Sequence, residues 1–452
     1  MQRSLSRKRL PSLAWLTAII VIGGCASRQP EPTARSVPPP VRRGSLAITN
    51  GIKILGSVEL PSGFVPDLDY GPIWIGQGTE VGVAGTVEGT SALLSFSLPK
   101  LADGQRIIAE DFGIGAPRGR ILGVAASPSG PELAIAIAEP AEDRVEVIVR
   151  GGPVAGDGRT VATIAGAYAR AQLKWIDATT ITIALRTSAP DPAGTLADGT
   201  RTGYDLVVIK VGNSPETHAL TRLRCELSEL NFSPDGRFAV AQGDAETPPA
   251  LIDLRNETCA QLRRHEPIRV VAWAPDDATL LYVALGKERV PSIFRYDRLS
   301  GESVVVAIAS GAAAYTADGT IIALGNERLS WEAARTAWRK SMAAKIALWS
   351  RGREELTINS LGFETTPELL AQASMVFAPG SDDGLIDIAA IKAAQSVREL
   401  IAYSYPARAA FVLATTSPDA MIGKSWSPDG KLIALVDASA QPGILTVIAP
   451  PR

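Results

Sequence analysis

The segment Trp426-Ser427-Pro428-Asp429-Gly430 decides the fold of this chain, because near-copies of it recur along the sequence. Phe232-Ser-Pro-Asp-Gly and Trp273-Ala-Pro-Asp-Asp repeat it almost unchanged. Looser copies stand at Tyr315, Phe377, Trp175, Trp74 and Ala126, the last of which keeps the turn and loses the ring. A unit that recurs every ~50 residues indicates an array of similar modules rather than one irregular domain.

Each copy predicts the same order of strands. The copy at Phe232 predicts strands over 229–233, 238–241, 251–254 and 260–263, and Pro-Asp-Gly supplies the first turn. Four antiparallel strands per unit, repeated around a closed ring, define an all-β protein of the β-propeller class. Eight markers predict eight four-stranded blades, or seven if the copy near Trp74 or Trp175 is misread.

The two ends of the repeat array predict how the ring closes. After Trp426 the sequence supplies only two more strands, so the last blade lacks one. Ile52, Ile54, Val58 and Leu60 alternate with polar residues, which is the pattern of a half-buried strand. We therefore expect the segment 45–60 to add the outermost strand of the last blade.

The first 24 residues have the composition of an export signal. Basic residues over 3–9 precede a short apolar stretch over 10–22, and Val21-Ile22-Gly23-Gly24-Cys25 follows. This sequence resembles a bacterial lipobox, which implies cleavage before Cys25 and acylation of that residue. The alternative is an ordinary secretory leader with an incidental cysteine. The predicted organisation is a signal peptide over 1–24, a lipidated cysteine and proline-rich tether over 25–44, and a propeller over 45–452.

The resemblance implies a place in the cell. Several acyl chains on Cys25 would hold the protein on a membrane surface. This predicts a cell-envelope location: the outer membrane, facing the periplasm, in a Gram-negative cell, and otherwise the outer leaflet of the cytoplasmic membrane.

A second resemblance concerns the repeats. The segments 231–240 and 424–435, each built on Ser-Pro-Asp-Gly, are similar to the WD-repeat-like repeats of TolB-type proteins and of prolyl-oligopeptidase-like propellers. The resemblance implies the propeller fold. TolB-type proteins are envelope proteins that dock other proteins, and such a role is an analogy here because the shared residues form turns and packing contacts.

Composition and motifs argue against several functions. The formal net charge of −2 gives no electrostatic reason to expect a nucleic-acid partner. The sequence has no recognisable catalytic motif, and its two histidines do not form a metal-ligand pattern. We predict no catalytic residues, no metal and no cofactor. Calcium in the central channel is an alternative, since Asp276, Asp277, Asp318, Asp382 and Asp383 lie in turns, but a turn role is the simpler interpretation.

Cys225 and Cys259 are the cysteines left after Cys25. A pair in an exported protein usually forms a disulfide. The expected strand positions place the two residues near opposite faces of one blade, which argues against the bond. Both alternatives stay open.

Two repeats are longer than the others, by the segments 188–203 and 326–343. The second segment predicts a helix capped by Ser330. Trp331, Ala334, Trp338 and Met342 line one face of this helix, and Arg335 and Arg339 lie on another. Trp331, Arg335, Trp338 and Arg339 predict a partner-binding surface, because tryptophan and arginine dominate interface energetics. The alternative is that both tryptophans pack against their own blade.

The sequence therefore favours a membrane-anchored binding or scaffold module for a protein or glycan partner in the envelope. The alternative is a propeller enzyme of the lactonase, sugar dehydrogenase or lyase type, with a site at the mouth of the central channel. A third reading is a structural accessory of an export or cell-wall system.

Overall fold

A computed structural model describes most of the chain beyond residue 45. The described residues are 46–98, 109–110, 119–139, 143–151, 158–187, 204–211, 216–223, 229–242, 250–254, 256, 258–262, 266–325, 334, 336, 339, 342–350, 353–378, 381–392, 395–407 and 409–451. All of them belong to one compact unit, Arg42–Arg452. The predicted signal peptide and tether lie outside the described residues. No helix in the described part is long and apolar enough to cross a membrane.

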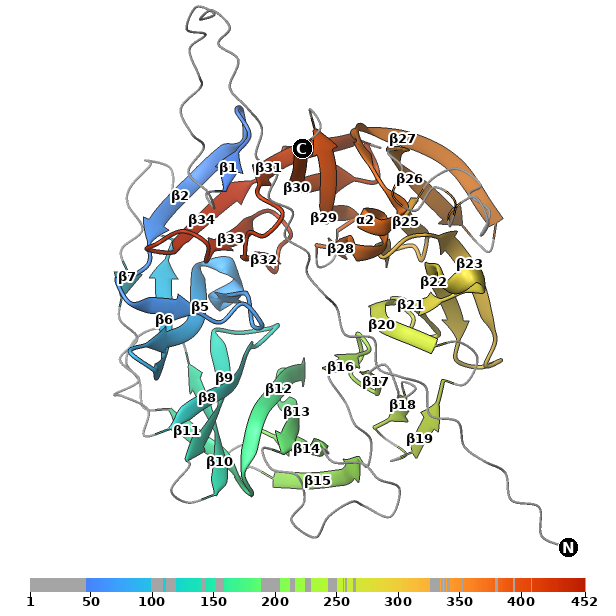
Figure 1. Ribbon diagram of the computed structural model, residues 1–452. Coiled ribbons are helices and arrows are strands. Elements are labelled where there is room, and N and C mark those ends of the chain that lie inside the picture. Colours follow the sequence, from blue (N-terminus) through green and yellow to red (C-terminus); the bar gives the residue numbers. More distant parts are fainter. Residues whose placement is uncertain are drawn as a thin grey trace, which may run out of the picture. The chain divides into compact units, whose positions relative to one another are not determined.

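The described chain is an all-β β-propeller of antiparallel sheets (Figure 1). Five sheets have four strands, each hydrogen-bonded to its neighbours in sequence order except where the N-terminal strand joins the last sheet. Four of these are β8 (Arg120–Ala126), β9 (Glu132–Glu139), β10 (Arg144–Gly151) and β11 (Arg159–Ala165); β12 (Tyr168–Asp177), β13 (Thr180–Thr187), β14 (Tyr204–Lys210) and β15 (Glu216–Leu223); β16 (Glu229–Phe232), β17 (Phe238–Gln242), β18 (Ala250–Asp253) and β19 (Thr258–Gln261); and β20 (Glu266–Trp273), β21 (Thr279–Leu285), β22 (Pro291–Asp297) and β23 (Ser303–Ile308). The fifth is β2 (Lys53–Glu59), β34 (Ile444–Ala449), β33 (Ile433–Asp437) and β32 (Ile422–Trp426).

Two sheets are larger. A five-stranded sheet holds β3 (Phe64–Pro66), β4 (Pro72–Ile75), β5 (Glu80–Val87), β6 (Thr90–Ser97) and β7 (Ala109–Glu110). A nine-stranded sheet holds β24 (Ala313–Tyr315), β25 (Ile321–Gly325), β26 (Met342–Ser350), β27 (Arg353–Thr365), β28 (Ser374–Phe377), β29 (Asp383–Lys392), β30 (Gln395–Ser404), β31 (Ala409–Thr416) and β1 (Ala47–Ile48). The short helices are η1 (Gly76–Gly78), η3 (Lys287–Arg289) and α2 (Pro367–Gln372), which Thr366 caps.

The predicted count of eight blades is wrong, because the structure has seven. The modules that begin at Tyr315 and Phe377 share one sheet. Their union comes from β27, whose 13 residues reach far enough for Glu364 to pair with Ile391 of β29. The copies at Trp74 and Trp175, which the sequence left in doubt, belong to two separate sheets: Trp175 lies in the first strand of its sheet, and Trp74 lies in β4, which pairs with β5 alongside β3. All eight markers therefore lie on or at the end of a first strand, while two modules join into one blade.

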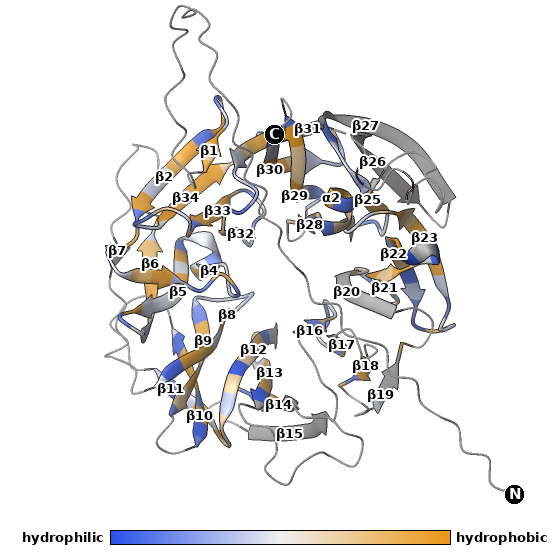
Figure 2. Cartoon of the chain, in the orientation of Figure 1, coloured by the Kyte–Doolittle hydropathy of each residue, from blue (hydrophilic) through white to orange (hydrophobic). Residues whose placement is uncertain are grey.

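The predicted closure of the ring is confirmed. Strand β2 pairs antiparallel with β34 as the outermost strand of the last sheet. Leu60 is buried where this strand ends, in a cluster with Val436 and Leu445 of the last blade and Trp74 and Phe96 of the first. In Figure 2 both β2 and β34 carry a largely hydrophobic sequence. The two ends of the array thus share one apolar seam, which hydrophobic burial stabilises.

The N-terminal segment makes a second contact that the sequence did not predict. Strand β1 pairs with β31, so it extends the neighbouring nine-stranded sheet. The backbone amide of Leu46 donates a 2.9 Å hydrogen bond to Asp437 of the last blade. Residues 46–59 therefore join two adjacent blades rather than one.

The recurring turn is explained by one buried hydroxyl. In the last blade the Ser427 hydroxyl donates to Asp429 at 2.7 Å and accepts from the amide of Leu432 at 2.8 Å. Ser427 is fully buried, and Gly430 has a φ of 67°, which favours glycine. Ser233 makes the same two contacts in its own blade. A Ser-Pro-Asp-Gly turn thus satisfies the backbone where the chain reverses.

The tryptophan markers connect neighbouring modules through one repeated hydrogen bond. The indole Nε1 of Trp175 donates to the carbonyl of Ala125 at 3.1 Å, and that of Trp273 donates to Asn231 at 3.3 Å. Trp426 and Trp74 continue the pattern with Val376 and Ser425, both at 3.3 Å. In every case the acceptor immediately precedes the marker of the preceding module. The bond from Trp74 to Ser425 joins the first module to the last one, so the same kind of hydrogen bond also closes the ring.

Candidate functional site

The strand order gives the propeller two different faces. Turns between first and second strands, and between third and fourth strands, lie on one face, which we call the turn face. First strands begin on the opposite face, where the second strand also connects to the third; we call it the start face. Both predicted insertions join a second strand to a third, so the strand ends that flank them lie on the start face.

A cavity of about 650 Å³ opens on the start face across the first three modules. We call it the Tyr70 cavity. Arg120 begins β8 and Arg170 lies near the beginning of β12, so both guanidinium groups reach the cavity from innermost strands. Further lining residues are Asp67, Asp69, Ala84, Gly85, Thr86, Gly89, Thr90, Ser91, Gly119, Ile121 and Ala169. Its volume lies within the range of small-molecule and cofactor sites.

Opposite charges define the polar groups of this cavity. Arg170 Nη2 lies 3.3 Å from Asp69 Oδ2, and Arg120 Nη2 donates to the Tyr168 carbonyl at 3.1 Å. The Tyr70 hydroxyl donates to the carbonyl of Leu122. Burial, reinforced by the negative charge of Asp67, raises the pKa of Tyr70 to about 12. Tyr70 therefore stays protonated at neutral pH and acts as a donor.

The structure brings little of the predicted partner surface into view. Trp331, Arg335 and Trp338 lie outside the described residues. Arg339 is described, its side chain is 83% exposed, and its Nε lies 3.4 Å from Glu368 Oε2. Ala334, on the predicted apolar face, is buried with Val290 and Ala309.

Ala334 is helical and Arg339 lies in a turn, so the partner surface of these four residues stays a prediction. One detail of the predicted pattern is wrong, since Met342 begins strand β26 instead of extending the helix.

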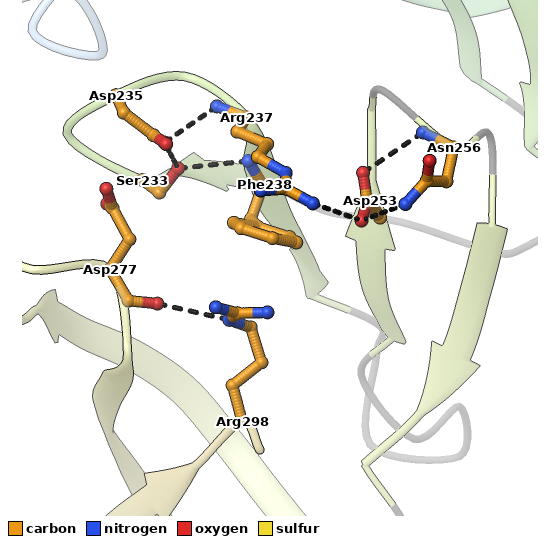
Figure 3. Close-up of polar contacts among 8 residues, drawn as sticks. All are labelled: Ser233, Asp235, Arg237, Phe238, Asp253, Asn256, Asp277 and Arg298. Carbon is orange, nitrogen blue, oxygen red and sulfur yellow. Dashed lines mark hydrogen bonds and ion pairs between the residues drawn. The ribbon is translucent and has the colours of Figure 1, made fainter.

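A second polar region lies on the turn face between the modules of β16 and β20 (Figure 3). The ring of Phe238 lies between two guanidinium groups, with Arg298 at 4.1 Å and Arg237 at 4.8 Å from the ring centre. Arg237 also lies 3.5 Å from Asp253, and Arg298 donates to the carbonyl of Asp277 at 3.2 Å. Cations on both sides of one ring stabilise this contact between modules.

Asp277 is unusual within this region, because it stands where the other turns have glycine. Its φ is 56°, close to the 68° of Gly236. Burial and the negative charge of Asp235 raise its pKa. Its Oδ1 is buried and has no hydrogen-bond partner among the described residues. Lys174 reaches toward this pair and donates to the Ser233 carbonyl at 3.0 Å.

Two other predicted ligand groups accept hydrogen bonds, Asp318 from its own turn and Asp382 from the turn of the neighbouring module. Asp318 accepts hydrogen bonds from Thr316 and from the amide of Thr320, and Asp382 accepts from the amide of Ala317 at 2.8 Å. They act as turn residues in these contacts. No group of three His, Cys, Asp or Glu residues in the described part of the chain could hold a metal ion.

Of the two cysteines in the predicted disulfide, the structure describes only Cys259. Cys225 lies outside the described residues. Cys259 lies within β19 rather than just before the fourth strand, where the sequence had placed it. The disulfide therefore stays a prediction.

A buried ion-pair network joins the last two modules. Asp387 of β29 accepts from Arg398 at 2.7 and 2.6 Å and also contacts Lys424 of β32. Burial alone would raise the pKa of Asp387, but the hydrogen bonds from Arg398 and the charge of Lys424 hold it below its usual value. Arg398 also donates to the Ala420 carbonyl at 2.6 Å. Every charged group here has a partner, so we interpret the network as structural.

Sequence reasoning missed the residues of the Tyr70 cavity. A signal did exist, since Arg120 and Arg170 each stand five or six residues before a repeat marker, at the beginning of an innermost strand. Nothing in the sequence showed that the β3–β4 connection would place Tyr70 between them.

Comparison with solved structures supports the fold. Oligogalacturonate lyase from Vibrio parahaemolyticus superimposes with a TM-score of 0.52 and 11% identity, over 91% of this chain and 99% of that one. An oligogalacturonate lyase in complex with manganese gives 0.51 and 12% identity, over 91% and 99%. TolB from Acinetobacter baumannii gives 0.32 and 14%, over 82% and 76%. No family model and no curated protein matches the sequence. At such identities the comparison defines the chain as a β-propeller protein and assigns no activity.

Proposed function

We propose that this protein is a lipid-anchored β-propeller of the cell envelope that binds a protein or glycan partner through the Tyr70 cavity. The observation that carries the proposal is the cavity itself. It is a concave site of about 650 Å³ at the junction of three modules, and charged residues of both signs line it. A scaffold module needs such a site on a rigid frame.

The chemistry of the lining supports recognition rather than catalysis. Arg120 and Arg170 supply planar donors, and Asp67 and Asp69 supply acceptors. Tyr70 is held protonated by its raised pKa, so it cannot act as a general base near neutral pH. Closely spaced donors and acceptors suit a partner rich in hydroxyl or amide groups.

The anchor rests on the sequence around Cys25. Acyl chains on this residue would hold the propeller at a membrane, and the proline-rich segment 25–44 would separate the two. The location that follows is the outer membrane, facing the periplasm, in a Gram-negative cell, or the outer leaflet of the cytoplasmic membrane otherwise. Cys25→Ser should abolish labelling by a fatty-acid analogue and move the protein to the soluble fraction. A variant that stays in the membrane fraction without label would refute the anchor.

The binding site can be tested with a photo-crosslinking amino acid. Thr90 lines the cavity and is exposed, whereas Leu299 is 81% exposed on the turn face and serves as a matched control. A probe at Thr90 should capture one envelope partner that the probe at Leu299 does not capture. Arg120→Ala combined with Arg170→Ala should reduce the capture at least about tenfold, since each charged hydrogen bond contributes 1.5–3 kcal/mol or so. Equal capture from both probes would remove the cavity from the proposal.

The same experiment distinguishes the binding module from the alternative of a propeller enzyme. If the captured partner is a glycan, its length is measured after incubation with the purified protein. An unchanged glycan supports the binding module. Cleavage or oxidation that disappears in the double arginine variant would favour the propeller enzyme.

A further inference from the structure

A second and smaller cavity lies on the turn face, away from the site proposed above. Its volume is about 280 Å³, and it lies between the first turn of the β20 module and the first turn of the β24 module. We call it the Arg295 cavity. Arg295 reaches it from β22, and Thr279 and Tyr315 add hydroxyl groups. Asp276 and Asp318 complete its polar lining.

Arg295 is the group in this cavity whose hydrogen-bonding needs are not met. Its Nε is buried and has no hydrogen-bond partner among the described residues. A buried donor without an acceptor is rare in folded proteins, because it loses water and gains nothing in exchange. Because Nε is buried, a ligand in the cavity would contact Arg295 through the other atoms of its guanidinium.

The acidic residues of the cavity are already engaged. Asp318 accepts hydrogen bonds from Thr316 and from the amide of Thr320. Asp276 accepts from the amide of Ala278 at 3.0 Å. Each of these two carboxylates is held by its own turn and forms no ion pair with Arg295 among the described residues, and Arg295 interacts electrostatically with Asp297 on its own strand.

One hydroxyl proton of the Tyr315–Thr279 pair stays available as a donor, because the other proton is used in the bond between them. Tyr315 and Thr279 share a 2.8 Å hydrogen bond, and burial raises the pKa of Tyr315 to about 12. Tyr315 thus remains protonated at neutral pH.

We propose that the Arg295 cavity binds a small carboxylate that also carries hydroxyl or ammonium groups. The planar guanidinium matches a carboxylate in a bidentate pair. The nearby Asp276 and Asp318 repel a doubly charged phosphate more strongly than a singly charged carboxylate, and they accept hydrogen bonds from donors on the same ligand. About nine water molecules of ~30 Å³ would fill the cavity, which limits the ligand to the size of an amino acid or a short hydroxy acid.

The test uses the purified full-length chain without its lipid and isothermal titration calorimetry at pH 7 in low salt. The probes are L-lactate, glycerate, L-serine, L-threonine, lactamide and inorganic phosphate. Lactamide keeps the shape of lactate and lacks its charge. We expect at least one of the four carboxylates to bind in a saturable way, and lactamide and phosphate to bind at least tenfold more weakly.

Arg295→Met removes the guanidinium and keeps an unbranched side chain. It should weaken carboxylate binding at least tenfold, while Arg339→Met, on an exposed arginine of the start face, should leave it unchanged. Arg295→Met should fold with a thermal midpoint no lower than that of the natural chain, because the unmatched buried donor is gone. The proposal is overturned if no carboxylate binds, if phosphate binds best, or if binding survives in Arg295→Met. The two proposals can fail separately: if the crosslinking experiment captures no partner at the Tyr70 cavity, the calorimetric result for the Arg295 cavity still stands.

Discussion

Leu60 tests whether the N-terminal strand holds the ring closed. Its side chain is 2% exposed and packs in the cluster that joins the last blade to the first. Its amide donates to the carbonyl of Gly443 at 2.7 Å, and this bond survives any change of side chain. Leu60→Ala therefore removes apolar contacts from the seam and leaves the backbone pairing intact.

The size of the effect follows from burial. Replacing a fully buried leucine by alanine costs 2–5 kcal/mol, and about 3 kcal/mol is a reasonable expectation here. Ile54 lies in β2, the strand that Leu60 directly follows, pairs with Ile448 and is 50% exposed. Ile54→Ala is therefore a matched control, and its cost should stay below about 1 kcal/mol.

Equilibrium unfolding in urea, followed by tryptophan emission, measures the difference. Trp74 and Trp426 stand on the two sides of the seam and report on it directly. The midpoint of Leu60→Ala should fall clearly below that of Ile54→Ala, with similar slopes. Removal of residues 46–59 should be more severe, because it also exposes the paired edges of β34 and β31. Equal midpoints for the two alanine variants would show that the seam does not hold the ring.

Two further substitutions test the repeat turn and the buried ion pairs. Gly430→Ala should lower the free energy of unfolding by about 1–2 kcal/mol, because Gly430 has a φ of 67°. Gly151→Ala should be near neutral, since no atom lies within 4 Å of its added Cβ. Similar losses for the two variants in urea unfolding would contradict the role given to the turn. Asp387→Asn should cost about 3 kcal/mol at pH 7, because it leaves Arg398 and Lys424 without their counter-charge. The pKa of Asp387 is lowered in the folded state, so its contribution is complete above about pH 4 and is lost as the pH falls through the folded pKa. The gap between the two proteins should therefore narrow in acid, and a gap that stays constant with pH would refute the ion-pair account.

The repeat markers were predictable because their causes are local. Ser427, Asp429 and Gly430 form their turn with bonds to residues no more than five positions away. The strands of the Phe232 module were placed within two residues, since each is an apolar stretch close to a turn. The closing strand followed from its alternating pattern.

The number of blades was not predictable in the same way. The pairing of Glu364 with Ile391 depends on how far β27 continues past its own module, and no local signal marks that length. The hydrogen bonds from tryptophan to backbone carbonyl groups were equally unpredictable, because the residues they join are between 42 and 351 positions apart in the sequence. The Tyr70 and Arg295 cavities both lie between modules, so their lining comes from segments that only the ring brings together.

The sequence by itself determined the module, the turn that begins it and the strand that closes the ring, because hydrogen bonds and side-chain alternation within a short segment specify all three. Tertiary structure alone decided which modules merge, which carbonyl each indole reaches and where Tyr70 and Arg295 meet their neighbours. The physical reason is distance along the chain. Contacts between modules depend on how whole sheets pack, and no single segment of the sequence specifies that packing.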